Sequence, residues 1–263
     1  MTDAAAVFDD LRDEGDELDR LVADLPGEHW AAPTPAPGWS IAHQIAHLAW
    51  TDDRTLLAAT DPEAFAEDLV RAAATITTYV DEGAAAGAVV PPADLLARWR
   101  EGRAAVLAAL LAVPAGQKLP WYGPPMSAPS MATARLMETW AHALDVADAL
   151  GVRREPTARL RHIARLAART RDFAYGVRAE QPPAEQFRVE LTGPGGESWA
   201  FGPEDATQRV TGPALDFCLL AAQRVHRDDT ALVAVGRDAD HWLDIAQMFA
   251  GPPGEGRKPG ERA

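Results

Sequence analysis

The first two thirds of the chain alternate between segments with apolar residues at helical spacing and loops that contain proline. From residue 4 to residue 25 the apolar positions recur every three to four residues, which predicts an amphipathic helix ending before Pro26. Residues 33–39 are too rich in proline to be helical, and Ser40 after them is a good N-cap for a helix to about Ala59. Further helices are expected over residues 61–81, 93–111, a segment around Glu138, and 156–177, with a long loop over 114–129.

Beyond Pro183 the pattern changes to the alternation that is typical of strands. Residues 187–191 and 198–201 alternate between apolar and polar side chains, and the glycine-rich turn between them predicts a β-hairpin. The apolar run 231–235 predicts a further strand. The other elements expected here are a short strand at 207–210 and helices over about 212–224 and 242–249.

These elements predict an α+β protein with two domains. Residues 1–180 are expected to form a helical bundle with extra helices, and residues 185–250 a small α/β domain. The tail 251–263 is too rich in proline and glycine to pack as a regular element. None of the glycine clusters has the spacing of a phosphate-binding or dinucleotide-binding loop.

Composition and charge narrow the function. The 263 residues have a formal net charge of −14 and no basic stripe that could neutralise phosphates, which argues against nucleic-acid binding. No apolar run reaches membrane-spanning length, and no signal peptide is visible. The single cysteine, Cys218, excludes an internal disulfide and lies in an apolar run, where a buried, inert thiol is expected. We therefore expect a cytoplasmic protein that acts on small molecules and takes any reactive thiol from outside.

Polar residues of types that bind metals repeat along one face of the helix around Glu138. Glu138, His142 and Asp145 are three to four residues apart, and small residues border them. The opposite face is apolar, so we expect this helix to lie between neighbours. A buried glutamate next to a histidine needs a partner, and a simple hydrogen bond between the two would satisfy this need without a metal.

A metal site needs about three protein ligands from different segments, with an open position if the metal is catalytic. Residues 40–48 offer His43 and His47 on a second helix. His47 lies among apolar neighbours and is the better candidate on burial, whereas His43 is nearer the capped end. A pair made by His43 and His47 alone is the alternative. The remaining histidines show no comparable grouping: His29, His162, His226 and His241.

Two runs of sequence carry a family resemblance. They are residues 34–48, Thr-Pro-Ala-Pro-Gly-Trp-Ser-Ile-Ala-His-Gln-Ile-Ala-His-Leu, and residues 138–145, Glu-Thr-Trp-Ala-His-Ala-Leu-Asp. Together they resemble the mycothiol-dependent maleylpyruvate isomerase family of the DinB-like superfamily. Residues 189–236, with Val-Thr-Gly-Pro-Ala-Leu-Asp at 210–216, resemble the second domain of that family, so the resemblance covers nearly the whole chain.

The resemblance implies a DinB-like four-helix bundle followed by a sterol-carrier-like α/β domain. It implies a divalent metal, usually zinc, held by His47, Glu138 and His142, in agreement with the site expected from helix geometry. Asp145 would then orient a ligand or hold a water instead of coordinating the metal. Arg224 matches a family arginine that points towards the active-site cleft, and the competing interpretation is a surface arginine favoured by the helix dipole.

In that family the metal serves thiol chemistry, which implies mycothiol as a cosubstrate. Zinc with an open position lowers the pKa of a bound thiol below its free value of about 8.5, and the thiolate attacks an electrophilic carbon. Rotation and expulsion of the thiol give isomerisation, a lasting adduct gives transfer, and water in place of the thiol gives hydrolysis. Two alternatives stay open: a tailoring enzyme of a secondary pathway that uses no thiol, and a non-catalytic metal-binding module.

Two regions depart from the family pattern. Residues 61–92 are long and acidic, and residues 118–126 are rich in aromatic residues and proline; we expect both to border the pocket. Trp121, Tyr122 and Met126 are expected to form a substrate wall. Such a wall suits a larger or more apolar substrate than maleylpyruvate, so that substrate is not transferred to this chain. The sequence leaves the oligomeric state open.

Overall fold

The chain divides into two compact units, Met1–Arg154 and Glu155–Ala263, and the computed structural model describes residues 3–75, 78–254 and 256–261. This division differs from the domain boundary expected between residues 180 and 185. Residues 160–176, expected in the first domain, form helices α7 and α8 of the second unit, because the apolar stripe of α7 packs on α9 and α8 packs on α10. Their bounds are α7 (Leu160–Arg169), α8 (Arg171–Gly176), α9 (Ala214–Ala221) and α10 (Arg237–Ile245).

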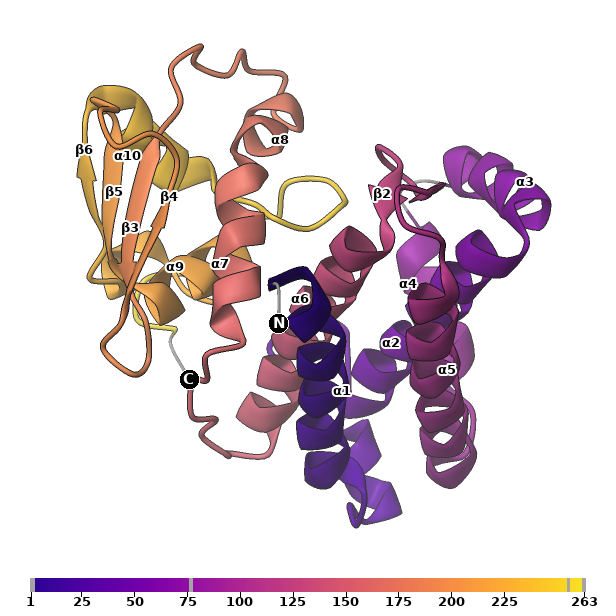
Figure 1. The fold of residues 1–263 in the computed structure, drawn as a ribbon. Coiled ribbons are helices and arrows are strands. Elements are labelled where there is room, and N and C mark those ends of the chain that lie inside the picture. Colours follow the sequence, from indigo (N-terminus) through magenta and orange to yellow (C-terminus); the bar gives the residue numbers. More distant parts are fainter. Residues whose placement is uncertain (1–2, 76–77, 255, 262–263) are drawn as a thin grey trace. The chain divides into compact units, whose positions relative to one another are not determined.

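The first unit is a bundle of four long helices with smaller elements attached (Figure 1). The long helices are α1 (Asp3–Val22), α2 (Ile41–Thr60), α5 (Pro92–Ala112) and α6 (Ala128–Ala149). α2 packs on α5 and α6, and α1 packs on the same two helices. The smaller elements are the 3₁₀ helix η1 (Gly27–Ala31), α3 (Pro62–Ala74), α4 (Tyr79–Ala88) and a hairpin of β1 (Lys118–Leu119) with β2 (Met126–Ser127).

Apolar side chains from all four long helices meet in the core of this unit. Leu18, Ile45, Trp99 and Val146 come from α1, α2, α5 and α6, and each is at most 1% exposed. The periodicity that predicted these helices therefore reflects a shared core, as expected of amphipathic helices in a bundle.

The single helix expected over residues 61–81 is wrong in extent. α3 ends at Ala74, and α4 begins only at Tyr79. Residues 75–78 are β-branched in sequence, a composition with low helix propensity, although residues 76–77 lie outside the described part of the chain.

Two glycines allow α4 to approach α2 closely. A Cβ atom at Gly83 would lie 2.7 Å from the ring of Trp50, and one at Gly87 would lie 2.7 Å from the Cβ of Ala46. Any larger residue at these positions would push α4 away from α2. The glycines therefore hold α4 against the face of α2 that also carries His47.

The second unit contains a four-stranded sheet in the order β4-β3-β5-β6. β3 pairs antiparallel with β4, as expected for the hairpin, but parallel with β5, and β5 pairs antiparallel with β6. The strands are β3 (Arg188–Thr192), β4 (Ser198–Phe201), β5 (Arg209–Pro213) and β6 (Val233–Val235). With the helical first unit, this sheet and its helices confirm the α+β fold class.

Cys218 is a buried free thiol in α9, as the sequence predicts. Its Sγ–H donates to the carbonyl oxygen of Leu160 at 3.7 Å, and burial raises the pKa of the thiol above its usual range. The thiol is therefore protonated and unreactive at neutral pH. Within the described residues, no helix combines the length and the apolar character needed to cross a membrane.

Candidate functional site

Three side chains with metal-binding atoms converge between α2 and α6. His47 comes from α2, Glu138 and His142 come from α6, and one ligand atom of each lies within 4.8 Å of the others. Glu138 Oε2 is 3.2 Å from His142 Nε2 and 3.5 Å from His47 Nε2. We call these three residues the His-Glu-His centre. The two helices that the sequence analysis singled out thus bring these three residues together.

His43, the alternative partner of His47, has a different position. Its Nδ1 accepts a hydrogen bond from the backbone N–H of Ser40 at 3.3 Å, at the start of α2. It therefore serves the N-terminal cap of the helix. The structure groups His47 with Glu138 and His142 instead.

A chain of hydrogen bonds fixes the orientation and protonation of His142. The hydroxyl of Thr34 donates to the carbonyl oxygen of Trp39 at 2.9 Å, since a carbonyl can only accept. The same hydroxyl oxygen accepts from Gln44 Nε2 at 2.8 Å, so Gln44 Oε1 faces His142 Nδ1 at 2.5 Å. His142 Nδ1 must therefore carry a proton, and in the neutral imidazole Nε2 holds the lone pair.

This arrangement makes the His-Glu-His centre suitable for a cation. The lone pair of His142 Nε2 faces the Glu138 carboxylate at 3.2 Å, and two acceptors at this distance repel unless a cation or a proton lies between them. The imidazole of His47 lies beside the same carboxylate, and its Nδ1 is buried without a hydrogen-bond partner. Two imidazoles and one carboxylate form a ligand set found in zinc enzymes with an open position. The residues present thus fit a divalent metal.

Burial and mutual contacts set the protonation of the centre. Burial is the main cause that lowers the pKa of His47 to about 4, and the neighbouring imidazole of His142 acts in the same direction. Burial alone would raise the pKa of Glu138, but the neighbouring imidazoles of His142 and His47 lower that pKa well below its ordinary value. At neutral pH His47 is therefore neutral and Glu138 is ionised, which are the forms that bind metals.

Two tryptophans surround the histidines. The ring of Trp39 stacks on His142, with planes 16° apart and centroids 5.9 Å apart, and lies 5.3 Å from the ring of His47. Trp50 lies 6.2 Å from His47. Trp39 Nε1–H also donates to Asp81 of α4 at 3.1 Å, which ties α4 to this side of the centre. Aromatic rings in these positions lower the local dielectric and strengthen electrostatic interactions at the centre.

A buried ion pair lies one turn from Glu138 on α6. Arg135 Nε donates to Asp52 Oδ1 at 3.0 Å, and Arg135 Nη2 donates to the carbonyl oxygen of Leu48 at 3.4 Å. The side chains of Arg135 and Asp52 are 3% and 6% exposed. The contacts pair ascending positions of α2 with descending positions of α6: Gln44 with His142, His47 with Glu138, and Asp52 with Arg135. α2 and α6 are therefore antiparallel at the centre.

Comparison with known proteins identifies the family. A family model described as mycothiol maleylpyruvate isomerase N-terminal domain matches residues 11–147, a range that includes all three residues of the His-Glu-His centre. The chain belongs to this family. A second family model, described as wyosine base formation, matches residues 183–235 of the second unit.

A curated relative matches nearly the whole chain, and two solved structures have a similar fold. An uncharacterized protein of Mycobacterium tuberculosis, present in strains CDC 1551 / Oshkosh and ATCC 25618 / H37Rv, is 59% identical over 257 residues. The match covers 98% of this chain and all of the relative. The crystal structure of mycothiol-dependent maleylpyruvate isomerase is 17% identical, with a TM-score of 0.58 over 88% of this chain and 92% of that one. The structure of a mutant of that enzyme matches equally, over 87% of this chain.

Asp145 and Arg224, the other residues expected to act in a family member, lie outside the group of three ligands. Asp145 is 1% exposed in α6, and the residue that holds His142 Nδ1 is Gln44. Arg224 follows α9 in the second unit, where its Nη1 donates to the carbonyl oxygen of Ala222 at 2.8 Å. The roles expected of Asp145 and Arg224 stay predictions.

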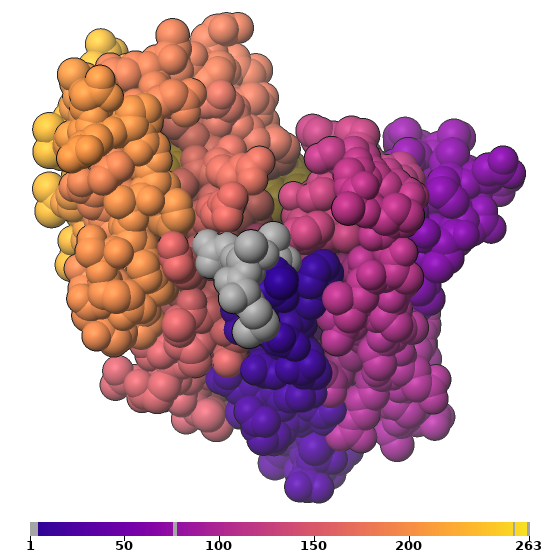
Figure 2. Space-filling view, in the orientation of Figure 1, coloured from indigo at the N-terminus to yellow at the C-terminus, as the bar shows by residue number. Residues whose placement is uncertain are grey.

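The aromatic residues expected to form a substrate wall belong to a cluster with α3. The ring of Trp121 stacks on Phe65 with planes 9° apart and centroids 5.8 Å apart, and Tyr122 contacts both rings. Met126 pairs with Leu119 in the β1–β2 hairpin. In Figure 2, α3 (purple) lies beside the segment that precedes α6 (magenta). Whether these side chains contact a substrate stays a prediction.

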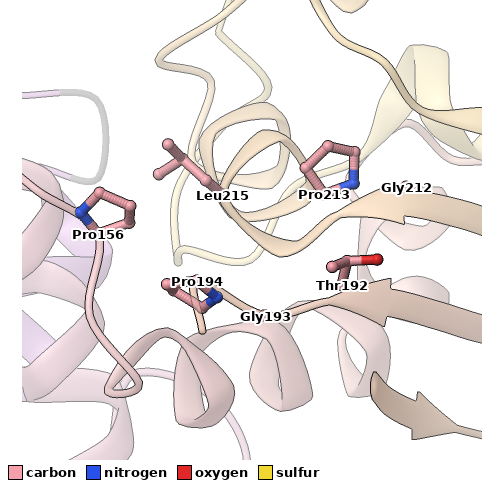
Figure 3. A pocket seen from close by; sticks show the side chains of 7 residues that line it. All are labelled: Pro156, Thr192, Gly193, Pro194, Gly212, Pro213 and Leu215. Carbon is pink, nitrogen blue, oxygen red and sulfur yellow. The ribbon is translucent and has the colours of Figure 1, made fainter. Parts of the chain in front are cut away.

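A hollow of about 440 Å³ lies elsewhere, in the second unit (Figure 3). It opens where the parallel strands β3 and β5 end, at Thr192 and Pro213. Its other lining residues are Pro156, Gly193, Pro194, Gly212 and Leu215. None of these side chains is ionisable or able to bind a metal, so this hollow does not compete with the His-Glu-His centre for the chemistry.

Three residues of the site were missed by sequence reasoning: Gln44, Trp39 and Trp50. Gln44 and Trp50 precede and follow His47 by three residues, so both share its side of α2. That spacing was a usable signal for these two residues. Trp39 precedes the helix, and only the folded path of residues 32–40 places it on the histidines.

Replacing Gln44 by leucine is expected to weaken zinc binding by roughly 10- to 100-fold, the usual effect of losing a residue that orients a ligand. Without Gln44 Oε1, the Nδ1 proton of His142 has lost its acceptor and the ring can rotate. Competition with a chromogenic zinc chelator measures the change. Gln44→Glu is the matched control, because its carboxylate still accepts from Nδ1, and equal losses in both variants would contradict the role of the acceptor.

Proposed function

We propose that the protein is a metal-dependent enzyme that activates a low-molecular-weight thiol for attack on a small electrophile. The observation that carries this proposal is the His-Glu-His centre, where two imidazoles and a carboxylate converge within 4.8 Å. Membership of the mycothiol maleylpyruvate isomerase family supports thiol chemistry at such a centre. We also propose that the protein acts in the cytoplasm, as the sequence led us to expect.

His47, Glu138 and His142 would hold the metal, and zinc is the ion that this ligand set favours. A bound zinc ion with an open position supplies positive charge, which lowers the pKa of a thiol or a water bound there. The protein holds its ligands ready for this role. Gln44 fixes the His142 tautomer, and burial keeps His47 neutral near pH 7. Trp39 shields both histidines from water by lying against them.

Mycothiol is the thiol we propose, because the solved relative of this fold is described as mycothiol-dependent. Its sulfur forms a bond to the electrophilic carbon of an activated alkene, and the electron pair of the double bond moves to the conjugated carbonyl oxygen. Rotation about the resulting single bond, followed by return of the electron pair and expulsion of the thiolate, gives cis/trans isomerisation. This sequence needs no oxidant or reductant.

Thiol consumption and alkene isomerisation in a panel of unsaturated carbonyl compounds test the function. With mycothiol and zinc present, we expect turnover above the uncatalysed rate, loss of that turnover after chelator treatment, and recovery on adding zinc. Turnover that requires the metal but no thiol would instead support the hydrolytic or thiol-free alternative. Zinc binding without any turnover would support the non-catalytic module.

A further inference from the structure

The two histidines of the His-Glu-His centre are held in different ways. The Nδ1 of His142 faces Gln44 Oε1 at 2.5 Å, so a hydrogen bond fixes the orientation of this ring. The Nδ1 of His47 is buried and has no hydrogen-bond partner among the described residues. A histidine that binds a metal normally donates its other ring N–H to an oxygen, and this bond fixes the ring. The orientation of His47 must therefore be set by other contacts.

Two indole rings lie against the imidazole of His47. Its ring centroid is 5.3 Å from that of Trp39 and 6.2 Å from that of Trp50, and the ring planes are 54° and 32° apart. Trp50 lies about one turn after His47 on α2, whereas Trp39 precedes the helix. Close packing against two large rings restricts the rotation of a side chain. We call Trp39 and Trp50 the tryptophan clamp.

Helix α4 fixes the position of Trp50. A Cβ atom at Gly83 would lie 2.7 Å from the Trp50 ring, so the backbone of α4 lies directly against the indole. Tyr79, the first residue of α4, packs edge-on against the same ring, with centroids 5.0 Å apart and planes 71° apart. The Trp50 ring therefore cannot move without displacing α4 or Tyr79.

Helix α4 also holds the side chain of Trp39. The indole Nε1–H, the one polar group of that side chain, donates to Asp81 Oδ1 at 3.1 Å. The backbone of Trp39 is fixed separately, because its N–H donates to the carbonyl oxygen of Ala36 at 3.0 Å and its carbonyl oxygen accepts from the N–H of Thr34 at 2.8 Å. A hydrogen bond to an ionised carboxylate is stronger than one between neutral groups. The bond to Asp81 therefore directs the indole onto the histidines.

We propose that α4 positions the ligand His47 through the tryptophan clamp, with Asp81 and Gly83 as the positioning residues. Asp81 acts through Trp39 and Gly83 acts through Trp50, and neither belongs to the three metal-binding residues. Displacement of either indole frees the imidazole to rotate, which lowers the fraction of molecules whose three donor atoms converge. This inference rests on the proposed function, because it concerns a residue that would hold the metal, and it extends that function to a helix that contributes no ligand.

Replacing Asp81 by leucine tests the contribution of Trp39. Zinc affinity, measured by competition with a chromogenic chelator, is expected to fall about tenfold, the lower end of the effect of losing a residue that orients a ligand. The visible absorption spectrum of bound cobalt(II), which reports the geometry of the ligands, should change as well. Asp81→Asn should restore the wild-type values, because its amide oxygen still accepts from the indole. Glu82→Leu is the matched control, because it removes an acidic side chain from the same first turn of α4.

Replacing Gly83 by alanine tests the contribution of Trp50, with Gly87→Ala as its control. Each substitution places a Cβ atom 2.7 Å from an atom of α2, but the first meets the Trp50 ring and the second meets the side chain of Ala46. Zinc affinity is expected to fall by about tenfold in Gly83→Ala and by less in Gly87→Ala. Equal losses in the two variants would contradict the proposal, since a general displacement of α4 would then explain both.

Wild-type zinc affinity and an unchanged cobalt(II) spectrum in Asp81→Leu overturn the proposal. Equal loss in Asp81→Leu and Glu82→Leu also overturns it, as does equal loss in Asp81→Leu and Asp81→Asn. If Asp81→Leu does not fold, Trp39→Phe keeps an aromatic ring without the N–H donor, and its zinc affinity must still fall.

Nuclear magnetic resonance of the metal-free protein separates this proposal from the proposed function. The ring-proton signals of His47, assigned by their loss in His47→Ala, are expected to shift in Asp81→Leu, because the indole ring that shields them moves. This shift in a protein that takes up no zinc would refute the proposed function and leave the positioning of His47 standing. Unshifted signals in a protein that binds zinc normally would refute the positioning alone.

Discussion

Alanine at position 47 or 138 is expected to lower zinc affinity by more than about 100-fold, beyond the 10- to 100-fold typical of losing a residue that only orients a ligand. Each change removes one of three converging donors, and two donors cannot hold the ion against solvent and chelators. Thiol-dependent turnover should fall to the uncatalysed rate with the metal. Elemental analysis after gel filtration and zinc titration against a competing chelator measure the loss.

His43→Ala is the control for His47→Ala. It removes an imidazole from the same helix, one turn away, that contacts Ser40 and lies outside the His-Glu-His centre. Zinc content should stay at the wild-type level in this variant. Normal zinc content in both His47→Ala and Glu138→Ala would refute the assignment of the centre.

Replacing Arg135 by methionine is expected to destabilise the first unit by about 3–5 kcal/mol, the cost of leaving one partner of a buried ion pair alone. Asp52 is 4% exposed, and burial raises its pKa although Arg135 acts in the opposite direction. Without Arg135 the carboxylate must protonate or stay charged in an apolar interface. Urea unfolding followed by circular dichroism measures the change.

The double variant Asp52→Leu with Arg135→Met is the companion experiment. It replaces the ion pair by apolar side chains of similar size, and such replacements are often neutral or stabilising. We expect it to recover most of the lost stability, because the penalty comes from the unpaired charge. If the double variant is as unstable as Arg135→Met, packing of the arginine side chain and not its charge supports α6.

The sequence predicted the helices of the first unit well where a shared apolar core sets the spacing. α2 and α5 begin and end within one residue of the expected positions, because Ser40 and Pro92 mark their first turns. The second unit was predicted less well, since α7 begins at Leu160 and not at Pro156, and α10 begins at Arg237 and not at Trp242. Short elements depend on tertiary packing more than on local signals.

The residues of the His-Glu-His centre show the same difference between what local sequence signals predict and what depends on tertiary packing. Helical spacing alone placed Glu138 and His142 on one face, and burial of its neighbours favoured His47 over His43. The sequence could not show that Gln44 Oε1 meets His142 Nδ1 or that Trp39 stacks on the ring, because both contacts depend on how two distant segments pack. The sequence could not show either that Asp68 accepts hydrogen bonds from Arg54, Arg71, Tyr79 and Tyr122, because these five side chains come from four separate segments.

By itself, the sequence determined which residue types lie on which helix face and which family the chain resembles. Both follow from local periodicity and from the order of residues along the chain. Only the tertiary structure decided which helix faces pack together, in which relative direction the helices run, and which ring nitrogen of His142 carries the proton. The antiparallel packing of α2 on α6 adds His47 to the Glu138–His142 pair, so that three acceptor groups surround one point. A chain of hydrogen bonds from the carbonyl of Trp39 through Thr34 and Gln44 places the proton of His142 on Nδ1. These properties arise from contacts between groups remote in sequence, and no local pattern encodes them.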